Sequence, residues 1–283
     1  MSFHASTVRS ALAFALFSLS LSPLLHAQTP PSAGSSSSAT NSMSPSAIGR
    51  DTSPMNAENV LEMSNPQQDS KFQLFQQVPP NDYEKKIKLG EEFLKKYKDS
   101  PYRQPIFATL AVTYIQAGQP EKGYAAGANA VELNPNDIRT LAVLCQTMAR
   151  LYNPNAPDAA ERLASAEKYG NQVIATAPIL KKPATVSDQV FDAARTESLS
   201  MAYSGLGLIQ LRKNNFAGAV PNLEKAVTMD PKHDPTNYYL LGVANQNSGH
   251  SEAAIDAFTH CATAPGNLQD TCKSALETAK KSK

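Results

Sequence analysis

The sequence predicts an all-α protein, built as a solenoid of stacked antiparallel helix pairs, and three observations lead to this fold class. Residues 203–226 recur at 238–261, with large side chains matched to large ones and small to small. A fixed period of this length is typical of stacked helical pairs. Apolar residues recur at helical spacing through most of the chain after residue 81, between turns rich in Gly, Pro and Asn. Tryptophan is absent and aromatic residues make up 7% of the chain, which suits cores built from many Ala and Leu side chains.

The first 27 residues have the pattern of an export signal. Arg9 provides a positive start, residues 11–25 provide an apolar run, and Ala27 is a small residue before the expected cleavage. The apolar run is short for a membrane span, and no later segment reaches transmembrane length. We therefore expect an exported protein, periplasmic or secreted, without bulk membrane insertion after cleavage. Retention by an uncleaved N-terminal anchor is the alternative.

Two segments precede the clear repeats. Residues 28–58 are rich in Ser, Pro, Ala and Thr, a composition that buries too little apolar surface to offset the entropy lost on ordering. They predict a disordered N-terminal tether. Residues 59–103 predict N-terminal helices and a degenerate first repeat, whose clearest helix starts at Asn81 or Asp82 and runs to about Lys98.

Because of the charge pattern, we do not expect a nucleic-acid partner. The formal net charge is +1, and charged residues make up 18% of the chain. The lysines of the helix at 81–98 alternate with glutamates, so we interpret them as a solvated helix face rather than a basic patch.

Two helix pairs follow, at 104–137 and 138–178. The first pair turns at 117–120, where Gly and Pro disfavour a continuous helix, and small residues on its second helix let the two axes approach closely. The second pair repeats the apolar spacing of the first, but its turn, at 152–158, is longer. Residues 179–199 then predict a connection that extends into a long helix.

The two best-matched repeats occupy 200–234 and 235–266. Residues 267–283 predict a capping helix, because the last apolar face of a repeat array would otherwise meet water. The residues expected to pack these two repeats are Tyr203, Leu206, Gly207, Ala219, Leu223, Ala226, Tyr238, Leu241, Gly242, Ala254 and Phe258.

These packing residues resemble the tetratricopeptide repeat family, and the resemblance extends over about residues 81–264. In the family pattern, a large residue and a Leu precede a small residue on the first helix, and small residues flank a large one on the second. Gln210 and Asn245 depart from the pattern, since the family usually packs a large residue there. The resemblance implies a right-handed α-solenoid that binds other proteins and carries no cofactor.

The resemblance also implies a location for the binding surface. The first helix of each pair faces the concave groove, and positions 2, 5, 9, 12 and 13 of a repeat share one helical face. Arg side chains there could hold a carboxylate through two hydrogen bonds, and Tyr and amide side chains could order a peptide backbone. For any single residue, an ordinary solvent-facing side chain is the favoured interpretation, and the set as a group is more suggestive than its members. The candidates are Arg139, Gln146, Arg150, Arg212, Tyr239, Gln246 and Asn247.

The resemblance does not imply one class of partner that the family has, the heat-shock chaperones. Members that bind the acidic tails of heat-shock chaperones carry Lys and Asn at positions 5 and 9. This chain has Ala142 and Gln146 in one repeat and Ser204 and Leu208 in another.

The leading functional hypothesis is a non-enzymatic exported scaffold that binds a protein or peptide segment of unknown identity. Residues 90–97 resemble helices of periplasmic tetratricopeptide proteins of bacterial envelope assembly, which suggests a role in assembling or maintaining the envelope. One alternative is a structural envelope component that assembles through its outer faces. Another is an enzyme or small-ligand carrier that uses 152–158 or 179–187 as a lid.

Motifs for catalysis and metal binding are missing from the sequence. It has no HExxH and no CxxC, and His260, Cys261 and Cys272 lack the short paired spacing of structural zinc sites. Cys261 and Cys272 flank a Pro-Gly turn, and the sequence leaves two outcomes open. They form a disulfide, which export permits, or they pack unbonded as small apolar residues. Cys145 is expected to be a small buried hydrophobe.

Overall fold

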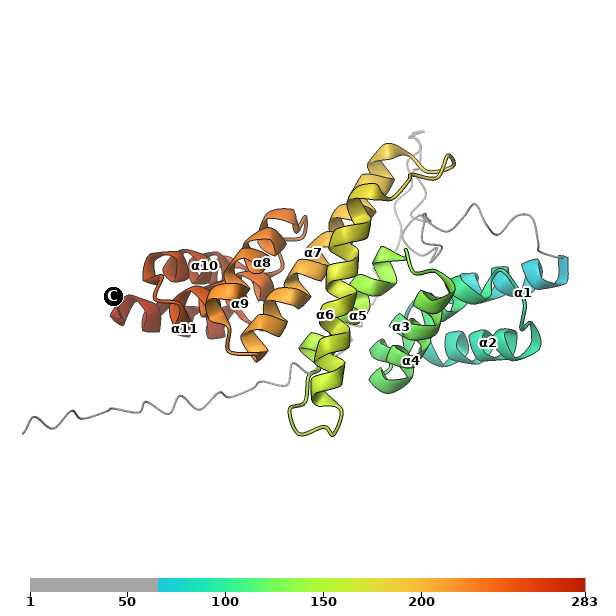
Figure 1. Cartoon of the computed structure of the whole chain (residues 1–283), viewed down its shortest axis with the longest axis horizontal. Coiled ribbons are helices and arrows are strands. Elements are labelled where there is room, and N and C mark those ends of the chain that lie inside the picture. The colour runs from blue at the N-terminus through green and yellow to red at the C-terminus, as the bar shows by residue number, and fades with distance from the viewer. Residues whose placement is uncertain (1–65, 283) are drawn as a thin grey trace, which may run out of the picture. The chain divides into compact units, whose positions relative to one another are not determined.

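The computed structural model describes residues 66–282, and within them it is entirely helical (Figure 1). The export signal predicted at 1–27 and the tether predicted at 28–58 lie outside the described residues. The helices are α1 (Pro66–Gln77), α2 (Tyr83–Lys96), α3 (Arg103–Gln116), α4 (Pro120–Leu133), α5 (Ile138–Arg150), α6 (Ala159–Thr176), α7 (Asp188–Arg212), α8 (Phe216–Met229), α9 (Pro235–Asn247), α10 (Ser251–Thr263) and α11 (Gln269–Lys281). A 3-10 turn, η3 (Ala177–Ile179), follows α6.

The helices pack as successive antiparallel pairs, which confirms the predicted solenoid. The pairs α3–α4, α5–α6, α7–α8 and α9–α10 pack closely, α5 also packs extensively on α7, and α11 covers α10 at the C-terminal end (Figure 1). The second helix of one pair also packs on the first helix of the next, as α6 does on α7 and α8 on α9. Among residues 66–282, no helix is long and apolar enough to cross a bilayer.

Polar side chains cap the starts of several helices, and one of them, Asp82, is a helix start that the sequence predicts. The side chains of Asp82, Ser187 and Asn215 each accept a hydrogen bond from a backbone N–H in the first turn of the helix that follows. Such a bond satisfies one of the N–H groups that a helix start leaves unpaired. Inside the pairs, the turns use left-handed backbone at Gly118 (φ 74°) and Asn214 (φ 57°), residue types that tolerate it.

A large side chain on one helix fills the space over a glycine on another. A Cβ placed on Gly207 would lie 2.5 Å from the Leu223 side chain, and one placed on Gly242 would lie 2.5 Å from Phe258. The same relation joins two successive pairs at Gly127. There Leu144 of α5 packs onto Gly127 of α4, so the large side chain comes from the next pair. All the repeat packing residues named from the sequence are buried except Tyr238, which is half-buried.

The two polar residues that depart from the repeat pattern, Gln210 and Asn245, form hydrogen bonds. The Gln210 amide donates to Glu167 of α6 at 3.2 Å and accepts from Asn215 at 2.9 Å. Asn245 is buried and donates to the Leu241 carbonyl oxygen one turn earlier at 3.1 Å. Both polar side chains are therefore satisfied where the large residue is missing, and Gln210 links α7 to α6.

The C-terminal helix α11 is fastened to α10 by a disulfide. Cys261 and Cys272 are bonded, their Cα atoms lie 5.7 Å apart, and both residues are fully buried. Around the bond, Ala254 and Phe258 of α10 pack with Ala279 of α11 in one apolar cluster. Of the two outcomes that the sequence leaves open, the structure has the bridge.

Candidate binding surface

The candidate residues lie on α5, α7 and α9, which are first helices of three successive pairs. We call these candidate residues, together with one added neighbour, the first-helix face, after the helices that carry them. Its residues are Arg139, Gln146, Arg150 and the added Tyr152, then Arg212, then Tyr239, Gln246 and Asn247.

The base of this face is set by the close approach of α5 and α7. A Cβ placed on Gly205 of α7 would lie 2.6 Å from the Cys145 Sγ and 3.1 Å from the Gln146 Cα. Gly170 of α6 meets the same sulfur, so Cys145 lies in a space bounded by two glycines. Burial raises the pKa of the Cys145 thiol to about 12. The thiol therefore stays protonated at neutral pH and serves in packing.

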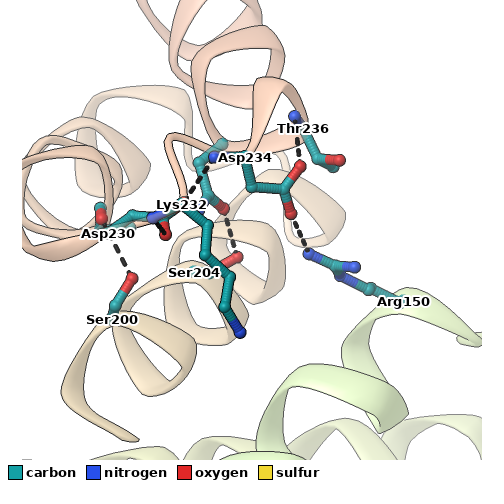
Figure 2. Close-up of polar contacts among 9 residues, drawn as sticks. Arg150, Ser200, Ser204, Asp230, Lys232, Asp234 and Thr236 are labelled. Carbon is teal, nitrogen blue, oxygen red and sulfur yellow. Dashed lines mark hydrogen bonds and ion pairs between the residues drawn. The ribbon is translucent and has the colours of Figure 1, made fainter. Parts of the chain in front are cut away.

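A polar network fixes the loop between α8 and α9 onto α7 (Figure 2). The Asp230 carboxylate accepts from the backbone N–H groups of Lys232 at 2.9 Å and Asp234 at 2.6 Å, and from the Asn237 amide at 3.3 Å. Asn237 in turn accepts from the Ser204 hydroxyl of α7 at 2.6 Å. Asp230, Asn237 and Ser204 are buried, so these bonds satisfy polar groups that water does not reach.

Two ion pairs extend from this loop. One Asp234 oxygen caps α9 by accepting from the Thr236 N–H at 2.9 Å, and the other accepts from Arg150 Nη2 at 3.3 Å (Figure 2). Lys232 donates to Glu197 of α7 at 2.7 Å, and this hydrogen bond raises the pKa of the lysine. Arg150 therefore has an intramolecular partner, and its pair joins the end of α5 to the start of α9.

Arg212, at the end of α7, has a different environment. Its Cζ lies 5.8 Å from the centre of the Tyr152 ring, and its buried Nε has no hydrogen-bond acceptor among residues 66–282. Burial lowers the pKa of the guanidinium, although an arginine remains charged in proteins. The sequence suggested Arg212 but not Tyr152, whose only sequence signal is an aromatic residue at the start of the inserted turn.

The remaining candidates lie along the face rather than around one point. The Tyr239 ring packs against Phe258, with centroids 5.9 Å apart. The Asn247 amide donates to the Val243 carbonyl oxygen of its own helix at 2.8 Å. Gln146 and Gln246 are half-buried, while Arg139 is exposed near the start of α5. The structure thus brings Arg150 to Asp234 and Arg212 to Tyr152, and distributes the other candidates over α5 and α9.

Sequence reasoning missed Asp234 as the partner of Arg150. In the sequence, Asp234 directly precedes a Pro at a helix start, and this pattern indicates a helix cap but not a long-range ion pair.

In chemical terms, the first-helix face offers a partner hydrogen bonds, the Arg212 cation and aromatic surface. Among residues 66–282, no three His, Cys, Asp or Glu side chains gather to hold a metal ion.

Comparison with known proteins gives one family match. Residues 202–233 and 235–267 match the family model of the tetratricopeptide repeat, and they contain the second half of α7 with α8, then α9 with α10. No curated protein matches the chain.

Two solved structures are similar to the chain in part. A thermophilic TPR protein of Thermus thermophilus is 16% identical, with a TM-score of 0.48, over 76% of this chain and 99% of its own. A tetratricopeptide repeat protein of Parabacteroides merdae is 15% identical, with a TM-score of 0.37, over 77% of this chain and 87% of its own.

Proposed function

We propose that this protein is a non-enzymatic scaffold that binds a protein or peptide segment on its first-helix face. The observation that carries this proposal is Arg212, a half-buried cation whose Nε lacks an acceptor within the described residues. The match of residues 202–267 to two tetratricopeptide repeats supports it, because such repeats typically mediate protein interactions. The network of Asp230, Asn237 and Ser204 holds the loop before α9 on α7. This favours the proposal, because a loop that is already held in place costs less to order when a partner binds.

Site-specific photo-crosslinking tests this proposal. A photoreactive amino acid replaces Gln246 or Tyr239 on the first-helix face, or Lys168 or Glu224 on the exposed sides of α6 and α8 as matched controls. We expect one defined adduct from the first-helix positions and none from the controls. Adducts that form equally at both sets of positions, or at the control positions alone, would contradict binding on this face.

We also propose that the scaffold works in the cell envelope. The export pattern of residues 1–27 and the likeness of residues 90–97 to envelope-assembly helices support this location. Fractionation of cells that express the full chain, with and without residues 1–27, tests it. We expect the full chain in the envelope fraction and the shortened chain in the cytoplasm. The same location for both would contradict export by this segment.

A second candidate function is lateral assembly through surfaces other than the first-helix face. Ile179 and Val190 favour it, because they are large apolar residues with 79% and 52% of their surface exposed at the connection between α6 and α7. Light scattering of the wild-type chain and of the double variant Ile179→Ser and Val190→Ser tests this candidate. An oligomer that dissociates in the variant supports it, and a wild-type monomer at high concentration argues against it.

A further inference from the structure

The connection between α6 and α7 projects from the helix pairs as a short spur, which we define as residues 177–197. Helix α7 has 25 residues and its partner α8 has 14, so the first turns of α7 have no counterpart on α8 (Figure 1). From Asp188 to Glu197, only Phe191 is buried. The packing of the repeats therefore leaves most of the spur in contact with solvent.

The spur exposes two large apolar side chains. Ile179 has 79% of its surface exposed, the largest share among the large aliphatic residues of 66–282, and Val190 has 52%. Removal of aliphatic surface from water is favourable, so an exposed apolar group on a projecting part of a fold indicates a contact with another surface.

Polar contacts hold the connection in one shape. The Lys182 Nζ donates to the Val186 carbonyl oxygen at 2.9 Å and pairs with Asp188 at 3.1 Å. The Val186 N–H donates to the Pro183 carbonyl oxygen at 3.1 Å. Because the ion pair joins the start and the end of the connection, the two exposed apolar side chains belong to one small region. A contact made there needs little further ordering of the chain.

One positive charge of the spur is left unbalanced. Lys182 is paired with Asp188, and Arg195 donates to Asp192 at 2.8 Å. Lys181 is exposed and has no ion pair among residues 66–282. An exposed aliphatic side chain close to a lysine suits a lipid surface, because the apolar part enters the boundary of the acyl chains while the lysine reaches the phosphate groups.

The size of the apolar contact favours a bilayer over a second copy of the chain. Stable protein interfaces bury about 1,200–2,000 Å² in total, and two aliphatic side chains provide a small part of that area. Lateral assembly through the same residues would need further surface. A bilayer requires no matching shape, and it accepts a few apolar side chains that a lysine supports.

We propose that the spur lies against the surface of an anionic phospholipid bilayer, with Ile179 and Val190 at the boundary of the acyl chains and Lys181 at the phosphate groups. This contact rests on the proposed location in the cell envelope, and it adds the surface by which the scaffold meets the membrane. None of the residues of the first-helix face lies in the spur, so the lipid contact and the proposed partner contact use different residues.

Co-sedimentation with vesicles tests the lipid contact. The chain is used without residues 1–27, because their apolar run would bind vesicles by itself, and all the described helices are retained. One set of vesicles contains equal parts of phosphatidylglycerol and phosphatidylcholine, and the other contains phosphatidylcholine alone. We expect binding to the anionic vesicles, weaker binding to the neutral ones, and a loss of affinity for the anionic vesicles with added salt.

Variants separate the apolar and the charged contributions, and urea titration checks that each is folded. Ile179→Ser combined with Val190→Ser is expected to lower the affinity for anionic vesicles about tenfold or more, because two aliphatic side chains are lost from the contact. Lys181→Gln is expected to lower it about fivefold and to leave binding to neutral vesicles unchanged. Leu133→Ser removes a leucine that is 51% exposed on α4, outside the spur, and is expected to match the wild type.

A fluorescent reporter gives a second readout that does not depend on a loss of binding. The chain contains no tryptophan, so Ile179→Trp introduces a unique one. Its emission is expected to shift to shorter wavelength when anionic vesicles are added. The emission of Leu133→Trp, the matched control, is expected to stay in place.

A wild-type chain that binds no anionic vesicles, or binds both kinds equally, overturns the lipid contact. Equal losses of affinity in Leu133→Ser and in the double variant also overturn it. Oligomers that form without vesicle binding and dissociate in the double variant assign the spur to a second copy of the chain, and they overturn the lipid contact too. Cell fractionation is independent of these results, so the lipid contact and the envelope location fail separately.

Discussion

At the residue scale, glycines decide how closely the helices beneath the first-helix face approach. Because Gly205 has no side chain, α7 lies against the Cys145 sulfur and the α5 backbone. Gly170 of α6 leaves room for the same sulfur. Protein interiors are packed as densely as organic crystals, so an added methyl group has to displace something. At Gly205 part of what it meets is backbone, which cannot rotate away.

Gly205→Ala is therefore expected to lower the free energy of unfolding by about 1–3 kcal/mol, the usual cost of overpacking a core. Urea titration measures this change. Adding Cys145→Ala removes the nearest obstructing atom, so the double variant should lose less stability than the two single variants together. Strict additivity would show that the thiol does not limit the approach of α7.

The Arg150–Asp234 pair should contribute little to stability, because about a third or more of each side chain is exposed. We expect a coupling free energy of about 0.2–1 kcal/mol from a double-mutant cycle of Arg150→Gln and Asp234→Asn, decreasing with added salt. Asp234→Ala should cost about 1 kcal/mol more than Asp234→Asn, because only Asn keeps a side-chain cap on α9. Equal losses for the two Asp234 variants would contradict the capping role.

Tyr124 on α4 makes stability depend on pH in the alkaline range. Burial raises the pKa of its phenol to about 12, and nearby Glu121 adds to the effect. The unfolded chain, with a pKa of about 10, releases this proton first, so the stabilisation is complete below about pH 10 and is lost as the pH rises toward 12. Urea titrations at rising pH should show a smaller decline for Tyr124→Phe than for the wild type. An identical decline would contradict the assignment.

At the element scale, helix ends were predictable and contacts between distant helices were not. Asp82 and Gly118 indicate a helix start and a turn through local chemistry, which the sequence displays directly. The Arg150–Asp234 pair joins residues 84 positions apart, and it depends on how α5, α7 and α9 cross. The acceptor-free Nε of Arg212 was likewise beyond sequence reasoning, since burial without a partner is a property of the packed fold.

The capping helix α11 gives a prediction at the same scale. A disulfide across so short a loop typically adds about 3 kcal/mol by restricting the unfolded chain. We expect reductant, or the double variant Cys261→Ala and Cys272→Ala, to lower stability by about that amount and to speed hydrogen exchange in α11 before other helices. The Cys145→Ala variant, which keeps the disulfide, should respond to reductant as the wild type does. Unchanged exchange in α11 on reduction would contradict a fastening role.

At the scale of the whole molecule, the repeats provide the framework, and we propose that the residues that do not repeat provide the specificity for a partner. Gly207 with Leu223 and Gly242 with Phe258 perform the same packing task in successive pairs. Arg212 and Tyr152, in contrast, belong to a single place in the array, where the inserted turn after α5 meets the end of α7. Changes there should alter partner binding while the helical framework persists.

The most direct measurement is the dissociation constant of the crosslinked partner for the wild type and four alanine variants of the full chain. Arg212→Ala and Gln246→Ala alter the first-helix face, and Lys168→Ala and Glu224→Ala alter the exposed sides of α6 and α8. We predict that Arg212→Ala weakens binding about tenfold or more, that Gln246→Ala weakens it less, and that the other two match the wild type. Affinity that falls in Lys168→Ala or Glu224→Ala, and holds in both first-helix variants, would contradict binding on this face.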